Sequence, residues 1–125
     1  MFQDLAIMRG AGALGRHAAA RQRLVAENIA QAGVPGALPR DLAPFAAMTG
    51  AQTPMRQTRA AHLGDGAPPM AAVTVDRSRR GPNGNGISLE AESLRAVRIE
   101  GQHRLAVAVY AKAHSMIRIG LGRPR

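Results

Sequence analysis

The sequence has no cysteine and no tryptophan, and its only aromatic residues are Phe2, Phe45 and Tyr110. Without cysteine there is no disulfide framework, and the redox environment stays undetermined. Large side chains bury the most apolar area, so 125 residues whose apolar content is mostly Ala, Val and Leu form a weak core. The composition therefore limits the chain to at most one domain with little burial of its own.

Long apolar runs are also missing. No window approaches roughly 18–20 uninterrupted apolar residues, so we expect no direct membrane span. The N-terminus does not resemble a secretory signal, because Asp4 stands where positive charge is needed and Arg9 and Arg16 interrupt any apolar run. If the protein leaves the cytoplasm, we expect an export route that does not cleave this segment.

Acidic residues are few, 8 against 17 lysines and arginines, which gives a net charge of +9. The excess is spread along the chain, as it is on an ordinary solvated surface. The sharpest basic cluster, Arg77-Ser78-Arg79-Arg80, has no aromatic residue beside it on which a base could stack. A solvated cluster is therefore favoured, and a basic nucleic-acid-binding protein stays open as the alternative.

The residue patterns of enzymes and metal sites are absent as well. His17, His62, His103 and His114 have no partner at metal-ligand spacing, so we expect them to be solvated. Asn83-Gly84-Asn85-Gly86 lacks the strand and the Lys-Ser/Thr of a phosphate loop, and predicts a turn before a helix. No serine lies in a nucleophile context. The sequence thus predicts no catalytic residue, no cofactor and no metal.

A first helix is expected within residues 3–32. A narrow stripe of the coiled-coil kind recurs at three- and four-residue steps, formed by Leu14, Ala18, Val25, Asn28 and Ala32. Gly10, Gly12 and Gly15 weaken the first half by up to about 1 kcal/mol each relative to Ala, so the secure part is about 14–32. Gly33 predicts a C-cap, and Pro35 prevents continuation.

Seven of the eight prolines fall between Pro35 and Pro82, where regular helix is therefore not expected. Only Val73-Thr74-Val75 is typical of a strand, and it is short. We predict three segments: an N-terminal helix in 1–32, a Pro/Gly-rich extended or disordered linker in 33–86, and a C-terminal helix in 87–125.

The strongest helix signal covers residues 88–119. Ser88 or Asn85 offers a cap, and Glu90 and Glu92 lie in the first turn, where the helix dipole favours anions. One predicted apolar face contains Leu94, Val97, Gly101, Leu105, Ala108, Val109, Met116 and Ile119, and the opposite side contains Ile99, Val107, Tyr110, Ile117 and Leu121. A helix that is apolar on two opposite faces needs neighbours on both sides.

The length of this helix supports the same interpretation. Some 31 residues at a rise of 1.5 Å give about 46 Å. A compact chain of this size has a radius of gyration of only about 14 Å. We therefore predict a mainly α fold in which the N- and C-terminal helices pack as a coiled-coil-like pair around a largely irregular middle segment, with a second face left for other subunits.

Two motifs resemble the flagellar basal-body rod proteins, most closely the proximal rod members. Asn28-Ile29-Ala30, Pro35-Gly36, Arg40-Asp41 and Phe45 are similar to the N-terminal family pattern A-N-I-A-N-x-x-T-P-G-Y, followed by A-R-D and a Phe. Residues 84–92, GNGISLEAE, resemble the family entry into its last helix, G-N-x-V-D-L-E-x-E. Met116-Ile117-Arg118 resembles the family ending. The matches cover roughly residues 14–45 and 83–121.

The resemblance implies a non-enzymatic structural subunit of the bacterial flagellar proximal rod, exported by the flagellar type III apparatus without signal cleavage. The implied partners are copies of itself, other rod proteins, and the membrane-ring and export-gate junction at the rod base. Asn28 would satisfy backbone groups or a neighbouring subunit, Pro35-Gly36 would turn the chain outward, and Arg40-Asp41 would pair or bridge subunits. The expected assembly interface comprises Asn28, Ile29, Pro35, Gly36, Arg40, Asp41, Leu94, Val97, Leu105, Val107, Tyr110 and Met116.

Two other functions remain as alternatives. A basic nucleic-acid-binding protein would show a steep dependence of its DNA affinity on salt concentration. A secretion chaperone or adaptor would be a folded dimer in solution, whereas a rod subunit would be largely unfolded alone.

Overall fold

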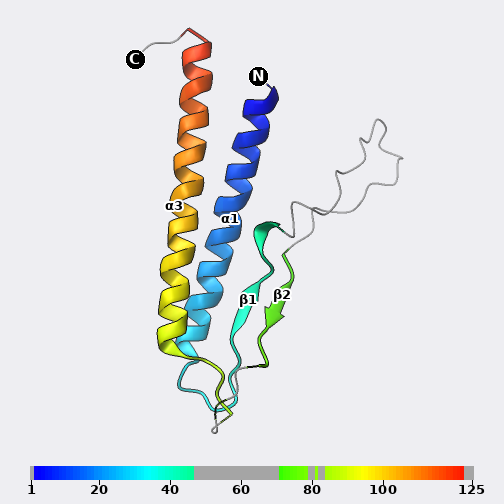
Figure 1. Ribbon diagram of the computed structural model, residues 1–125, viewed down its shortest axis with the longest axis vertical. Helices are drawn as coiled ribbons and strands as arrows, with labels where there is room; N and C mark the ends of the chain where they lie inside the picture. Colours follow the sequence, from blue (N-terminus) through cyan, green and yellow to red (C-terminus); the bar gives the residue numbers. More distant parts are fainter. Residues whose placement is uncertain (1, 47–70, 79–80, 82–83, 123–125) are drawn as a thin grey trace, which may run out of the picture.

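The computed structural model describes residues 2–46, 71–78, 81 and 84–122. Two long helices, α1 (Phe2–Ala30) and α3 (Leu89–Gly120), lie side by side and antiparallel, so that the two ends of the chain lie at the same end of the hairpin (Figure 1). Two short strands, β1 (Arg40–Leu42) and β2 (Val73–Val75), lie beside α1. The predicted mainly α fold with two packed terminal helices is confirmed.

The helix α1 begins earlier than its glycines predict. It is continuous from Phe2 through Gly10, Gly12 and Gly15. Ala11 is buried, and a Cβ added at Gly15 would lie 3.9 Å from the Cβ of Ala106, so this half of α1 packs on α3. Tertiary packing supplies most of the stability of a helix in a protein and here outweighs the local cost of glycine.

The end of α1 differs from the prediction at one residue. The helix closes through turn hydrogen bonds from Gln31 N to Glu27 O and from Ala32 N to Ile29 O. Gly33 is not in the left-handed conformation of a C-cap; Gly36 is, with φ of 78°. The left-handed residue therefore comes after Pro35, within the turn that leads to β1.

The core is a narrow seam between α1 and α3. Ala18, Val25 and Ile99 form its centre, with Ile29 and Ala96 packed against them. The buried positions of α3 repeat every seven residues, as in a coiled coil: Glu92, Ile99, Ala106 and Ala113. Because alanines occupy much of this seam, each helix turn buries little apolar area.

The predicted division of α3 into two opposite faces needs correction. The sequence predicts that Ile99, Val107 and Tyr110 share one apolar face of α3. Ile99 is buried against α1, but Val107 and Tyr110 are exposed. A heptad seam is narrower than a half-cylinder, so most large apolar side chains of α3 fall outside it.

The two strands form a small antiparallel sheet in which Arg40 pairs with Val75 and Leu42 with Val73. Hydrogen bonds from Ala43 N to Ala72 O and from Asp76 N to Pro39 O extend the ladder. The sequence predicts β2 and gives no signal for β1. A two-stranded sheet is marginal alone, and side chains of α1 support this one. Much of the predicted linker, residues 47–70, lies outside the described residues.

The turn before α3 packs on the turn after α1. Gly84, with φ of 75°, approaches Gly36, since a Cβ at Gly84 would lie 3.7 Å from the Gly36 Cα. Gly86 N donates to Ala37 O at 2.9 Å, and the Asn85 amide donates to Ala32 O. Ser88 caps α3 as predicted. The two segments that carry the resemblance, far apart in the sequence, therefore meet at the closed end of the hairpin.

Candidate functional site

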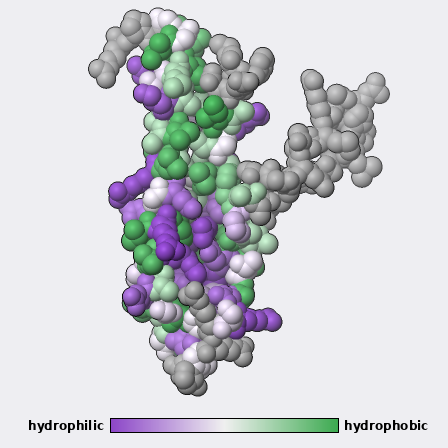
Figure 2. All heavy atoms as spheres, viewed as in Figure 1, coloured by the Kyte–Doolittle hydropathy of each residue, from purple (hydrophilic) through white to green (hydrophobic). Residues whose placement is uncertain are grey.

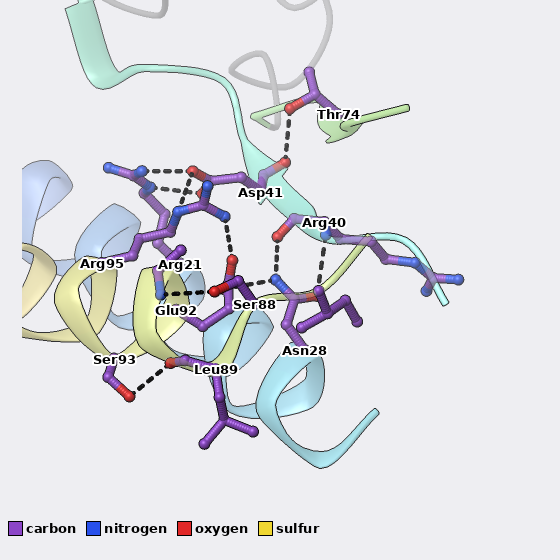
Figure 3. A network of polar contacts seen from close by, with 12 residues as sticks. Arg21, Asn28, Arg40, Asp41, Thr74, Ser88, Leu89, Glu92, Ser93 and Arg95 are labelled. Atoms are coloured by element: carbon purple, nitrogen blue, oxygen red, sulfur yellow. Dashed lines mark hydrogen bonds and ion pairs between the residues drawn. The ribbon is translucent and has the colours of Figure 1, made fainter. Parts of the chain in front are cut away.

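A buried polar network joins α1, β1 and α3 near the closed end of the hairpin (Figure 3). Asn28 lies at its centre and is 1 % exposed. Its amide nitrogen donates to Arg40 O at 2.8 Å and to Glu92 Oε2 at 3.0 Å. Its amide oxygen accepts from Arg40 N at 3.0 Å. One side chain thus satisfies the outer edge of β1 and holds that strand to both helices.

Asp41, the next residue of β1, is held by two arginines. Arg21 donates to it from Nε at 2.8 Å and from Nη2 at 2.6 Å, and Arg95 Nε lies 3.9 Å from Asp41 Oδ2. Leu42 N also donates to Asp41 Oδ1 at 2.8 Å. Burial acts to raise the pKa of Asp41, but the hydrogen bonds and charge of Arg21, the Leu42 amide and Arg95 outweigh it and leave the pKa below its usual value.

The pKa of Arg21 shifts in the opposite direction and is raised, mainly because its guanidinium donates hydrogen bonds to Asp41. On α3, Glu92 is 2 % exposed and accepts from Arg95 Nη1 at 2.9 Å as well as from Asn28. The chain of contacts runs Arg21, Asp41, Arg95, Glu92, Asn28. It contains two cations and two carboxylates, so the charges of the network balance around the buried Glu92.

His17 extends the contact between α1 and the segment after β1. Its Nε2 lies 2.8 Å from Ala43 O, and its ring centroid lies 5.6 Å from that of Phe45. The expectation that the histidines are solvated is wrong for His17, which is buried because it packs under this segment. Because a carbonyl oxygen can only accept, Nε2 carries a proton and donates it to Ala43 O.

The structure places the predicted interface residues in three settings. Asn28 and Asp41 lie in the network, and Ile29 packs against the core. Pro35 and Gly36 form an exposed turn, and the Arg40 side chain is exposed while its backbone is held by Asn28. Asp41 pairs with Arg21 and Arg95 of its own chain and not with Arg40, because β1 directs it toward the helices.

Four residues of the site were not predicted: His17, Arg21, Glu92 and Arg95. Arg21 carried a usable signal, because it falls between Ala18 and Val25 on the predicted stripe. A charge on a buried stripe requires a partner. Glu92 lies seven residues before Ile99 and carried the same signal, but a first-turn acid is equally well explained by the helix dipole.

The remaining predicted residues lie on α3 and are exposed. Exposed apolar side chains on this helix include Leu94, Val97, Leu105, Val107, Tyr110, Met116 and Ile119, of which Ile119 is 72 % exposed. In Figure 2 hydrophobic residues predominate toward the end of the hairpin where the termini lie, and hydrophilic residues gather lower down. The largest apolar patch on a typical monomer is roughly 300–600 Å² and is often functional.

The hollows along the described helix pair include a polar one of about 530 Å³, lined by Arg21, Asp41, Arg95 and Arg98 among others. Another, of about 440 Å³, is lined by Ala18, Ala19, Ala26 and Ile99 together with polar side chains. Within the described residues, no group of three or more His, Cys, Asp or Glu could hold a metal ion. None of the described helices is long and apolar enough to cross a membrane.

Comparison of the sequence with protein-family models and with curated proteins finds no match.

Proposed function

We propose that the chain is a non-enzymatic structural subunit of the bacterial flagellar proximal rod, which assembles with copies of itself and with other rod proteins. The observation that carries the proposal is the convergence of the two motifs. Asn28 and Arg40-Asp41 belong to the N-terminal motif, and Glu92 belongs to the C-terminal one. Asn28 bonds directly to Glu92 and to the Arg40 backbone, so residues that carry the resemblance are joined in one buried network.

The shape of the chain supports an assembly role. α3 contains 32 residues and spans about 48 Å. It buries only a narrow seam against α1 and exposes most of its large apolar side chains. Covering these side chains with other subunits would remove apolar surface from water and is therefore favourable. In the proposed rod the chain lies in the periplasm after export without signal cleavage, close to the membrane ring and the export gate.

Basal-body purification from the bacterium that encodes the protein tests the proposal. We expect a tagged chain to co-purify with hook–basal bodies, and its deletion to abolish swimming. The Asn28→Ala variant should be exported but incorporated poorly, whereas Gln22→Ala, a change at an exposed position of α1, should be incorporated normally. Normal swimming of the deletion strain, or basal bodies without the tag, would contradict the proposal. A steep salt dependence of duplex DNA affinity would support the nucleic-acid alternative instead.

A further inference from the structure

The polar hollow brings together three arginines from two helices. Arg21 lies on α1, and Arg95 and Arg98 lie one turn apart on α3. Asp41 is the only carboxylate among the described residues that line the hollow, and Glu92 pairs with Arg95 from outside the lining. Three guanidinium groups therefore face two carboxylates, which leaves an excess of positive charge. The volume of about 530 Å³ is within the range of small-molecule sites, roughly 300–1,000 Å³.

Two of the three arginines are held in position by the buried network (Figure 3). Arg21 donates to Asp41 from Nε at 2.8 Å and from Nη2 at 2.6 Å, and Arg95 Nη1 lies 2.9 Å from Glu92 Oε1. The side chains of Arg21 and Arg95 are only 18 % and 24 % exposed. Side chains that are already ordered lose little freedom when a ligand binds, so these two are preorganised donors.

The network uses only part of the hydrogen-bonding capacity of these arginines, because each guanidinium carries five N–H donors. Arg21 Nη1 makes only a long contact of 3.5 Å with Gln102 Oε1. Arg95 Nη2 has no partner among the described residues. Arg98 makes neither a hydrogen bond nor an ion pair within the part of the chain that the structure describes. All three guanidinium groups can therefore donate to a ligand in the hollow.

We propose that the polar hollow binds a phosphate group, held by Arg21, Arg95 and Arg98. A phosphate has enough oxygens to accept from three guanidinium groups, and the planar fork of arginine fits them in a bidentate manner. A monocarboxylate has only two oxygens and carries less charge. Asp41 opposes an anion, but its own charge is compensated by Arg21 and by the Leu42 amide. This inference goes beyond the proposed rod function and does not depend on it.

Binding at this place should stabilise the hairpin. Arg21 belongs to α1, and Arg95 and Arg98 belong to α3, so a ligand that contacts all three joins the two helices. A ligand that binds the folded form and not the unfolded chain stabilises the fold by mass action. Inorganic phosphate should therefore raise the urea midpoint of the chain, and its helix content where the chain alone is poorly ordered.

Equilibrium dialysis with inorganic phosphate measures the binding, at a protein concentration at which the wild type is helical and at constant ionic strength. Arg98→Gln is the test variant, because Arg98 is exposed and holds no described residue in place. We expect its Kd for phosphate to rise about tenfold, as for the loss of a hydrogen bond to a charged group. Arg98→Lys should bind with intermediate affinity, since it keeps the charge but not the fork. Arg118→Gln, which removes an exposed arginine in the last turn of α3, should bind like the wild type.

Urea unfolding in phosphate and in chloride of equal ionic strength supplies the second measurement. Phosphate and sulfate also stabilise proteins in general, because they are excluded from the surface. We expect phosphate to raise the midpoint more in the wild type and Arg118→Gln than in Arg98→Gln. Equal shifts and equal Kd values in the two glutamine variants would show general charge attraction and overturn the inference. Acetate that competes as well as sulfate, or a helical wild type that binds no phosphate at millimolar concentration, would overturn it too and leave the rod proposal intact.

Discussion

Replacement of Asn28 by Ala removes the residue on which the closed end of the hairpin depends. The change leaves three groups without their partner: the Arg40 amide, the Arg40 carbonyl and the Glu92 carboxylate. Glu92 keeps its contact with Arg95. We therefore expect β1 to detach from α1 while most of the contact between α1 and α3 remains.

The expected loss in the free energy of unfolding follows from the three hydrogen bonds that Asn28→Ala removes. Each bond to a neutral backbone group contributes about 1 kcal/mol, and a bond to a charged group about 1.5–3 kcal/mol. Since Asn28 and Glu92 are almost fully buried, water does not readily replace the lost contacts there. The Arg40 side chain is exposed, so its backbone can be partly rehydrated. We expect a loss of about 3 kcal/mol in the free energy of unfolding.

Urea unfolding followed by circular dichroism measures this loss, at a fixed protein concentration at which the wild type is helical. Gln22→Ala is the control, because Gln22 is exposed on the same helix, and it should change stability by less than about 0.5 kcal/mol. Equal stability of the Asn28→Ala variant and the wild type would refute the argument that Asn28 holds β1 in place.

Three further predictions concern the turn, the ion pair and the exposed side of α3. Gly36→Ala should destabilise the fold by about 1–2 kcal/mol in urea unfolding, because Gly36 has φ of 78°, whereas Gly33→Ala should have little effect because Gly33 is not in this region. The pKa of Asp41 is lowered in the folded state, so the carboxylate contributes its full stabilisation at neutral pH. This contribution should be lost as the pH falls below about 4 and through the folded pKa. Urea unfolding curves measured over a pH series should therefore show a weaker loss of stability in acid for Asp41→Asn than for the wild type. Leu105→Asp and Val107→Asp should each block incorporation into basal bodies, because the new charge would have to be desolvated when that side of α3 packs. Neither change should alter the helix content of the isolated chain, since both residues are exposed there. Normal assembly of either variant would contradict packing on both sides of α3.

The two helices and the N-cap of α3 follow from local sequence signals, which explains why they could be predicted. Ser88 caps α3, and the stripe through Ala18, Val25 and Asn28 is the buried seam of α1. These features depend on residues within a few positions of one another. The start of α1 at Phe2 was not predictable in the same way, because contact with α3 stabilises a glycine-rich segment.

The strand β1 and most of the polar network depend on contacts between distant residues. Arg40–Leu42 is a strand because Asn28 binds one edge and β2, more than 30 residues later, binds the other. The pairing of Arg21 with Asp41 likewise joins residues 20 positions apart. A single sequence contains no signal for such pairings, although a charge on a predicted buried stripe indicates that a partner exists.

Helix content and sedimentation, measured together over a range of protein concentrations, test the central claim that this hairpin is completed by other subunits. The alanine-rich seam leaves too little burial in one chain to offset the entropy of ordering it. We expect a dilute monomer to be poorly ordered at both ends and to gain helix as sedimentation shows assembly. A cooperative thermal transition in a dilute, strictly monomeric sample, unchanged by concentration, would contradict the account.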